Sequence, residues 1–300
     1  MVNLQTTLQQ RIQRFYDISS GVWERTWGEH MHHGYYGPDG TARPDRRQAQ
    51  IDLIDELLTF SQFSSPSASP NSSLTLLDVG CGIGGSSLYL AQKLGAIATG
   101  ITLSPVQANR AAERAQAAQI NAQFQVADAL AMPFDDNQFD LVWTLESGEH
   151  MPDKTTFLQE CHRVLKPGGT LIMATWCHRP VSSSVGLDSL VPEQPLTEKE
   201  QALLDSIYRI YHLPYVISLP DYEAIAQSLH FQQIRTADWS AAVAPFWDDV
   251  IRSAFSWAAI KGVLQAGPEI IQGAFAMRLM RQGYRQGLIR FGVLTATKHG

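Results

Sequence analysis

Residues 74–85, Leu-Thr-Leu-Leu-Asp-Val-Gly-Cys-Gly-Ile-Gly-Gly, decide the fold. The apolar run is short and ends at glycines, which is typical of a buried parallel strand that turns tightly into a helix. Glycines lack a Cβ atom, so they let the backbone turn sharply and let a ligand approach the main chain. Asp78 ends the strand, where a carboxylate suits a ligand that carries an ammonium group rather than a pyrophosphate.

The same alternation of strand and helix continues to about residue 178. Further strands are expected at 97–104, 122–128, 139–144 and 169–175, helices at 86–95, 105–119 and 155–165, and a Lys-Pro-Gly-Gly turn at 166–169. This alternation predicts a doubly wound parallel sheet. Beyond residue 180 the pattern predicts helices around 198–213, 221–229 and 246–265 and a final strand at 288–298.

Composition divides the chain into four segments. Residues 1–60 carry apolar side chains at helical spacing and are expected to form an N-terminal helical lid. Residues 61–73 form a Ser/Pro linker without core-forming side chains. Residues 74–180 are the expected cofactor-binding core, and residues 181–300 are expected to add substrate-covering helices and the final sheet strands.

Charge and cysteine content narrow the class of protein. The 300 residues carry 23 basic and 29 acidic side chains, a net charge of −6, whereas a nucleic-acid partner requires a basic surface. Three cysteines without a Cys-x-x-Cys pair indicate neither a disulfide framework nor a cysteine zinc site. No apolar run approaches the roughly 18 residues of a membrane helix, and the N-terminus resembles no signal or transit peptide. We expect a cytoplasmic protein, with peripheral contact to an internal membrane left open.

Further motifs stand at the ends of the later strands: Ile-Thr-Leu-Ser at 101–104, Ala-Asp-Ala at 127–129, Phe-Asp-Leu-Val-Trp-Thr at 139–144 and Leu-Lys-Pro-Gly-Gly at 165–169. As a set with the glycine turn, they resemble the class I S-adenosylmethionine-dependent methyltransferases over about residues 74–178. The resemblance implies an α/β fold: a Rossmann-like, seven-stranded, mostly parallel sheet with an N-terminal helical lid and a C-terminal helical substrate cover. It also implies S-adenosyl-L-methionine as the cofactor.

The resemblance assigns cofactor contacts residue by residue. Gly80 and Gly82 would line the methionine and ribose, and Asp128 would accept a hydrogen bond from the adenine amino group. Most such enzymes end the second strand with an acidic residue, but here Thr102, with Gln107, can bond ribose hydroxyls only as a neutral partner. The expected cofactor-binding set is His33, Gly34, Asp78, Gly80, Cys81, Gly82, Thr102, Leu103, Gln107, Asp128, Ala129 and Glu146.

Three flanking stretches narrow the family. Residues 15–38, 236–257 and 283–298 resemble the gamma-tocopherol methyltransferases. Plant members begin with a plastid transit segment, and its lack here is expected of a cyanobacterial-type member or of a trimmed chain. The implied reaction is C-methylation of a prenylated chromanol, gamma- to alpha-tocopherol first and delta- to beta-tocopherol second. A methyltransferase for a prenyl benzoquinol and a small-molecule N-methyltransferase on the same scaffold stay open as alternatives.

Catalytic candidates follow the fourth strand directly, in Glu146-Ser-Gly-Glu149-His150. Doubly wound folds place their ligands at this edge of the sheet, and histidine is the usual base near neutral pH. We expect His150 to act as the base or to orient a phenol, and Glu149 or Glu146 to hold its tautomer or contact the cofactor. Alternatively, His150 only packs on the cofactor or caps the next helix.

The histidines of the lid allow other interpretations. His30, His32 and His33 suggest a metal, but no fourth ligand lies nearby and methyl transfer to carbon needs none, so no metal is expected. By the resemblance, His33 and Gly34 lie at the methionine end of the cofactor, and His32 is the second candidate for the catalytic base. A plain histidine-rich loop is the alternative.

Aromatic side chains near the lid have two interpretations each. Tyr16, Trp27, Tyr35, Tyr36 and Trp143 could surround a sulfonium cation or belong to the core. A second set could enclose a prenyl tail or be the buried face of a helix; it comprises Phe246, Trp247, Val250, Ile251, Phe255 and Trp257. Motifs of DNA amino- and cytosine-methyltransferases and of short-chain dehydrogenases are missing from the sequence. A non-catalytic sulfonium sensor is the remaining competing class.

Overall fold

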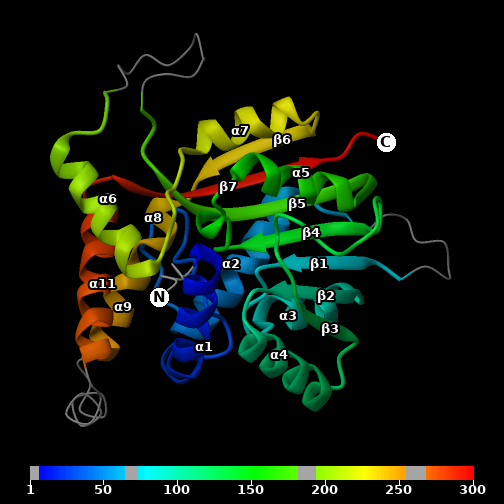
Figure 1. The fold of residues 1–300 in the computed structure, drawn as a ribbon, viewed down its shortest axis with the longest axis horizontal. Coiled ribbons are helices and arrows are strands. Elements are labelled where there is room, and N and C mark those ends of the chain that lie inside the picture. Colours follow the sequence, from blue (N-terminus) through cyan, green and yellow to red (C-terminus); the bar gives the residue numbers. More distant parts are fainter. Residues whose placement is uncertain (1–6, 65–72, 182–193, 255–267) are drawn as a thin grey trace, which may run out of the picture.

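The computed structural model describes residues 7–64, 73–181, 194–254 and 268–300. Within them, seven strands form one sheet in the order β3-β2-β1-β4-β5-β7-β6 (Figure 1). The strands are β1 (Thr75–Val79), β2 (Ile97–Thr102), β3 (Ala122–Val126), β4 (Phe139–Leu145), β5 (Leu165–His178), β6 (Gln232–Asp238) and β7 (Ile289–Thr297). Pairs from β3 to β5 are parallel, and β7 is antiparallel to both β5 and β6. The expected mostly parallel, doubly wound sheet is confirmed.

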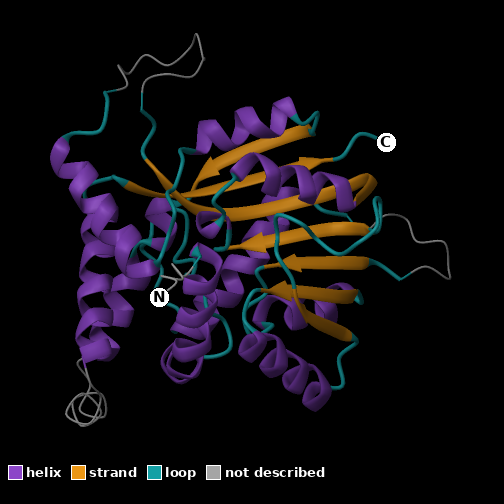
Figure 2. Ribbon diagram, in the orientation of Figure 1, coloured by secondary structure: helices purple, strands orange, loops and turns teal. Residues whose placement is uncertain are grey.

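Helices cover both faces of the sheet (Figure 2). They are α1 (Leu8–Trp27), α2 (Arg46–Ser61), α3 (Gly85–Leu94), α4 (Pro105–Ala118), the 3-10 turn η1 (Gly148–His150), α5 (Lys154–Val164), α6 (Glu198–Tyr211), α7 (Leu219–Ser228), α8 (Ser240–Val243), α9 (Pro245–Ala254) and α11 (Pro268–Arg285). Successive strand residues point to opposite faces. Leu76 and Ile172 accordingly pack in one hydrophobic cluster with α2 and α3, and Leu77 and Leu171 pack in a second cluster with α5 and α7. Both faces are buried, which explains the continuous apolar runs in the sequence.

The helix boundaries follow local chemistry. Thr7 caps α1 with a reciprocal capping box, and Ser104 caps α4 ahead of Pro105 at its first position. These side chains satisfy backbone N–H groups that have no partner within a helix. Gly95 ends α3 in the left-handed conformation at φ 63°, which glycine adopts without steric cost.

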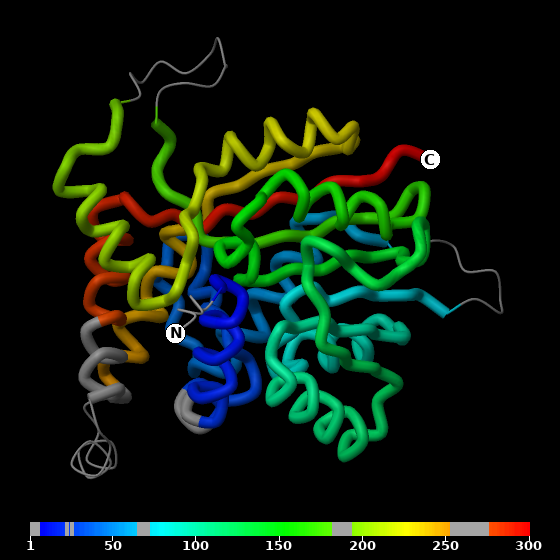
Figure 3. The backbone as a smooth tube through the Cα atoms, in the orientation of Figure 1, coloured from blue at the N-terminus to red at the C-terminus, as the bar shows by residue number. Residues whose placement is uncertain are grey.

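The lid and the cover converge on the carboxyl ends of the parallel strands. Figure 3 shows the blue N-terminal segment and the orange C-terminal helices gathered at this end of the sheet. Leu53 of α2, Trp143 of β4 and Phe246 of α9 belong to one buried cluster. The segments that the sequence separates therefore share a core in the folded chain.

The first helix of the lid ends at Gly28 with φ 89°. One expectation about local structure was wrong. The Lys-Pro-Gly-Gly stretch at 166–169 is part of β5, because an irregularity between the Phe139↔Leu165 and Leu141↔Thr170 pairs absorbs it. Strand β6 was not assigned separately.

Some expectations fall on residues that the structure does not describe. The second half of the helix expected at 246–265, most of the Ser/Pro linker and residues 182–193 lie outside the described ranges. Among the helices that are described, none combines the length and the apolar character needed to cross a membrane.

Candidate active-site cleft

A cleft opens where β1, β2 and β4 end and where helix α1 crosses them. The space inside it that the centre of a water molecule can reach is about 120 Å³. The walls comprise Ile12, Tyr16, Glu29, Met31, His32, Asp78, Gly80, Cys81, Gly82, Ile83, Gly85, Ser86, Ile101, Thr102, Leu103, Gln107, Ala127, Asp128, Ala129, Leu145, Glu146, Ser147, His150 and Met151. This position at the carboxyl edge is where open α/β sheets bind their ligands.

The glycine turn after β1 forms the floor of the cleft. Gly80 has φ 83°, and a Cβ atom on it would lie 2.3 Å from the Cβ of Ser147. Glycine is therefore required for the turn to approach the loop that follows β4. The amides of Gly80 and Cys81 both donate to the carbonyl of Ile101, at 2.9 Å each. The turn thereby joins the ends of β1 and β2.

Asp78 is a carboxylate buried in this floor. Its side chain is 2% exposed, and its Oδ2 accepts a 2.5 Å hydrogen bond from Ser87 Oγ at the start of α3. Burial raises the pKa of Asp78 to about 7, although the Ser87 hydrogen bonds act in the opposite direction. A buried carboxylate with a neutral partner gains strongly from a cation.

His32 lies across the cleft from the turn, on the lid segment. Its Nδ1 is 2.8 Å from the carbonyl oxygen of His33, which can only accept, so Nδ1 carries the proton. Nε2 has no partner among the described residues and is buried. Burial lowers the pKa of His32, so the ring is neutral and Nε2 is an acceptor. Asp78 and His32 thus both present acceptors to the cleft.

The other end of the cleft holds neutral and acidic groups. Thr102 Oγ1 donates to Gln107 Oε1 at 2.7 Å. Asp128 Oδ2 accepts from Gln9 Nε2 of helix α1 at 2.5 Å. The carboxylate of Asp128 thus already accepts a hydrogen bond from an NH₂ group.

Helix α1 brings a tyrosine to the candidate base. The hydroxyl of Tyr16 lies 2.8 Å from His150 Nε2, and Nδ1 of His150 has no partner among the described residues. Burial, followed by the charges of Lys154 and His212, lowers the pKa of His150 to about 3. Burial, followed by Glu149 and Glu146, raises the pKa of Tyr16. Both groups are therefore neutral near pH 7.

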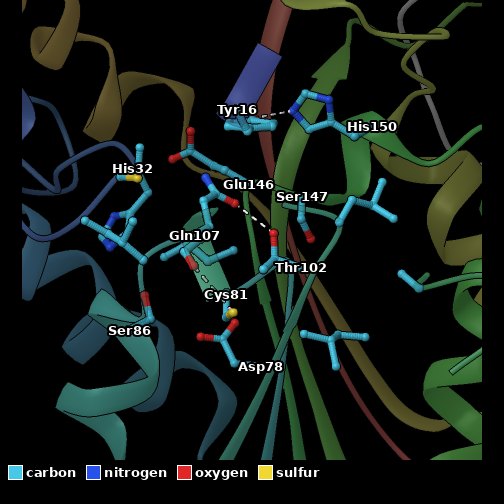
Figure 4. Close-up of a pocket in the computed structure, with 18 of the residues that line it drawn as sticks. Tyr16, His32, Asp78, Cys81, Ser86, Thr102, Gln107, Glu146, Ser147 and His150 are labelled. Carbon is cyan, nitrogen blue, oxygen red and sulfur yellow. Dashed lines mark hydrogen bonds between the residues drawn. The ribbon is translucent and has the colours of Figure 1, made fainter. Parts of the chain in front are cut away.

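Glu146 is a carboxylate at the same end of the cleft, opposite Asp78 (Figure 4). It accepts from the backbone N of His33 at 2.6 Å, from His33 Nδ1 at 2.8 Å and from Trp176 Nε1 at 3.1 Å. Burial alone would raise its pKa, but the charge and hydrogen bonds of His33 outweigh burial and the pKa is lowered. Its backbone is left-handed, at φ 54°. Glu146 is thus an oriented anion beside the neutral Tyr16–His150 pair.

Twelve of the fifteen residues predicted for the site line this cleft, and three do not. His33 lies behind Glu146, and Gly34 packs against α2. Glu149 points away, and its Oε2 accepts from Thr175 Oγ1 at 2.7 Å. Burial, and then the charge of Glu146, raises the pKa of Glu149 to about 8. The side-chain partner of His150 is Tyr16 rather than Glu149 or Glu146, and the alternative that one of these carboxylates contacts the cofactor stays a prediction.

The stability of a Gly34 variant tests whether this glycine is needed for packing against α2. A Cβ atom on Gly34 would lie 2.5 Å from the Cβ of Ala49. We expect Gly34→Ala to lower the free energy of unfolding by about 1–3 kcal/mol through overpacking. Thermal unfolding by circular dichroism measures this loss, with Gly95→Ala, a position without close neighbours, showing the effect of a left-handed backbone alone. Equal losses in the two variants would contradict the packing role.

Sequence reasoning missed the part played by the lid helix. Gln9, Ile12 and Tyr16 follow the i, i+3, i+7 spacing of one helix face, and this face meets the cleft. Tyr16 was considered only as an aromatic neighbour of a cation or as a core residue. The helical phase from the capping residue Thr7 was the available signal, but the partners across the cleft were not visible in it.

The aromatic residues of α9 form its buried face. Phe246, Trp247 and Val250 are fully buried, and Phe246 lies 5.4 Å from Trp27 and 4.8 Å from His33 between ring centroids. These side chains therefore form the buried face of a helix, and a contact with a prenyl tail stays a prediction. Phe255 and Trp257 lie outside the described residues.

Comparisons with known proteins agree with this geometry. Residues 77–173 match the family of methyltransferase domains. The chain is 47% identical over 97% of its length to tocopherol O-methyltransferase of Arabidopsis thaliana, of which it covers 82%. It is 37% identical over 93% of its length to 2-methyl-6-phytyl-1,4-hydroquinone methyltransferase of a Synechocystis strain, of which it covers 84%. Among solved structures, the [4+2]-cyclase SpnF superposes with a TM-score of 0.76 at 25% identity, over 98% of this chain and 97% of the other.

Proposed function

Because the chain belongs to the family of the tocopherol O-methyltransferases, we propose that it methylates a ring carbon of a prenylated chromanol, with gamma-tocopherol as the first substrate and delta-tocopherol as the second. It is an S-adenosylmethionine-dependent methyltransferase. The observation that carries the proposal is the neutral Tyr16–His150 pair, in which the candidate base already binds a phenol at 2.8 Å.

The cleft fits S-adenosylmethionine on the chemistry of its own side chains. Asp78 and the unpartnered Nε2 of His32 suit an ammonium group, since both are buried acceptors. Thr102 and Gln107 suit ribose hydroxyls, and Asp128 suits the adenine amino group because it binds an amide nitrogen in the same way. When bound, the cofactor supplies an electrophilic methyl group on a sulfonium.

The residues of the chain handle the protons of the acceptor. With its proton on Nε2, the imidazole of His150 donates to the hydroxyl of Tyr16, and Nδ1 is left to accept a hydrogen bond from the substrate phenol. Polarising this O–H bond places electron density on the ring carbon beside it, which becomes the nucleophile. Positioning of that carbon by the walls of the cleft supplies much of the remaining rate.

Carbon methylation also requires a base for the ring proton. Methylation of the phenol oxygen releases only the phenol proton, whereas methylation of carbon must also remove the proton of that carbon. Glu146 is an anion fixed by three hydrogen bonds beside the His150 pair. We assign it the ring proton, with the phenol proton returned from His150, so that one proton leaves in the net reaction.

One incubation tests the proposal. Purified protein receives methyl-labelled S-adenosylmethionine and detergent-dispersed gamma-tocopherol, delta-tocopherol, a phytyl benzoquinol and indole amines. Mass spectrometry locates the label, and acetylation of the product tests for a free phenol. Label on the ring of the tocopherols with the phenol intact is expected. Label on the phenol oxygen, or on the benzoquinol or amines alone, would overturn the assignment.

The lid end of the molecule is the proposed contact with a membrane, from which a prenylated substrate would arrive. Ile18 on helix α1 is 66% exposed, and an apolar side chain on a lid gains from insertion into a bilayer. When liposomes are sedimented, the pellet should contain a larger fraction of the wild type than of the Ile18→Asp variant. Equal retention of the two proteins would contradict this orientation.

Cofactor affinity should depend on pH through Asp78. Only its carboxylate form attracts an ammonium group, and the pKa in the free protein is about 7. We expect the Kd for S-adenosylmethionine to rise about tenfold per pH unit below pH 7 and to change little just above it. Isothermal titration between pH 5.5 and 8 measures this dependence. A Kd that stays constant over this range would contradict the role of Asp78.

A further inference from the structure

Lys154 is a buried cation outside the cleft. It begins helix α5 and is 2% exposed, a burial that lysine rarely reaches unless it is paired. Among the described residues it has no carboxylate within ion-pair distance. Its Nζ instead donates to the carbonyls of Gly148 at 2.8 Å and Glu149 at 3.1 Å.

These two carbonyls belong to η1, the three-residue turn that ends in His150. The carbonyl of Gly148 also accepts from the backbone N of Met151 at 3.2 Å and from the hydroxyl of Tyr222 at 3.3 Å, and the ammonium joins this carbonyl to that of Glu149. Nζ also lies 4.9 Å from the centre of the Tyr215 ring, where a ring face attracts a cation. The ammonium therefore connects the turn of His150 with the segment that follows α6.

That segment reaches the lid. His212 caps α6, and its ring lies 5.4 Å from the ring of Phe15, the neighbour of Tyr16 on α1. The side chains that bear on the imidazole of His150 thus come from three elements: Tyr16 from α1, Lys154 from α5 and His212 after α6. Lys154 is the cation of this group that touches the backbone of the turn.

We propose that Lys154 is a positioning residue whose buried ammonium holds the η1 turn, so that His150 meets Tyr16 and the acceptor. This inference rests on the proposed function, since it assigns Lys154 a part in the work of His150. The ammonium lies among backbone carbonyls and touches no wall of the cleft.

Lys154→Met tests the proposal, because methionine keeps the length of the side chain and removes the charge. We expect kcat at saturating substrates to fall about 10- to 100-fold, since small misplacements of a catalytic group have effects of this size. The Kd for S-adenosylmethionine should stay within about threefold. Lys154→Arg, which keeps the charge, should recover most of the loss. Lys93→Met removes a surface lysine paired with Asp55 and should leave kcat unchanged.

A purely structural lysine would lower the fraction of folded protein without moving the titration of His150. In histidine-labelled protein, with the signal assigned through His150→Gln, NMR should show the midpoint of His150 rising by at least about half a pH unit in Lys154→Met but not in Lys154→Arg. An unchanged midpoint together with an unchanged kcat per cofactor-binding site would overturn the proposal.

Two outcomes need separate readouts. If Lys154→Met does not fold, Tyr215→Leu takes its place. This variant removes the aromatic ring that contacts the ammonium, at a residue that is 39% exposed. We expect kcat to fall more than threefold, and an unchanged kcat would overturn the proposal. If the wild type transfers label to no acceptor, the proposed function has failed, and the NMR titration alone decides on Lys154.

Discussion

Replacing His150 with alanine is expected to lower kcat for gamma-tocopherol by about 10²- to 10⁴-fold, the usual contribution of a positioned general base. The imidazole is neutral at the pH of the assay because burial lowers its pKa to about 3, and Tyr16 fixes one of its nitrogens. Alanine removes the acceptor for the phenol proton and leaves the hydroxyl of Tyr16 without its partner. Initial rates with labelled cofactor measure the loss.

The same variant should keep its cofactor. The cleft is lined by Asp78, Thr102 and Asp128 independently of His150. The Kd for S-adenosylmethionine should therefore stay within about threefold of the wild-type value. His162→Ala is the matched control, since His162 lies on α5, against Phe231, and kcat should hold within about twofold. A His150→Ala enzyme with near-normal kcat would remove His150 from the chemistry and return it to a packing role.

The fold was predictable because its signals are local. The run at 74–85 and the glycines that end it specify a strand and a turn without reference to distant residues, and each later strand repeats the pattern. The continuation of β5 through Lys-Pro-Gly-Gly was not predictable, because only the pairing with β4 keeps that stretch extended. A local turn signal was overridden by a contact between segments.

The residues of the candidate site also divide into those that the sequence predicts and those that depend on contacts between distant segments. Asp78, Thr102 and Asp128 stand at strand ends, so topology alone brings them to one edge of the sheet. Other contacts could not be predicted in this way, namely those of the side chains of Gln9, Tyr16 and Lys154. Their partners lie several residues away or on another element, and the periodicity of their own segments does not reveal them. His33 was predicted from the family resemblance and Glu149 from its place beside His150, but neither side chain lines the cleft.

Asp78→Asn should weaken binding of S-adenosylmethionine about 30- to 1,000-fold, the range for removal of one partner of a buried charge pair. Asparagine has the same shape and still accepts from Ser87, so the loss reports the charge. The dependence of Kd on pH that Asp78 causes in the wild type should disappear in the variant. Asp140→Asn is the control, because Asp140 is paired with Lys166 at 2.8 Å at the opposite end of β4, and its loss should leave the Kd unchanged.

The effect of Asp78→Asn on the free protein should have the opposite sign. The pKa of Asp78 rises from 3.8 in the unfolded chain to about 7 in the fold, so the folded protein binds the proton more tightly and loses stability as pH rises between these values. At pH 8 the buried carboxylate costs on the order of 2–4 kcal/mol, and asparagine removes this cost. We therefore expect a higher Tm for the variant than for the wild type at pH 8 without cofactor, and no gain at pH 4. Weaker binding together with a lower Tm at pH 8 would show that Asp78 holds the turn rather than the ligand, since a carboxylate kept at a cost to stability is the mark of a binding site.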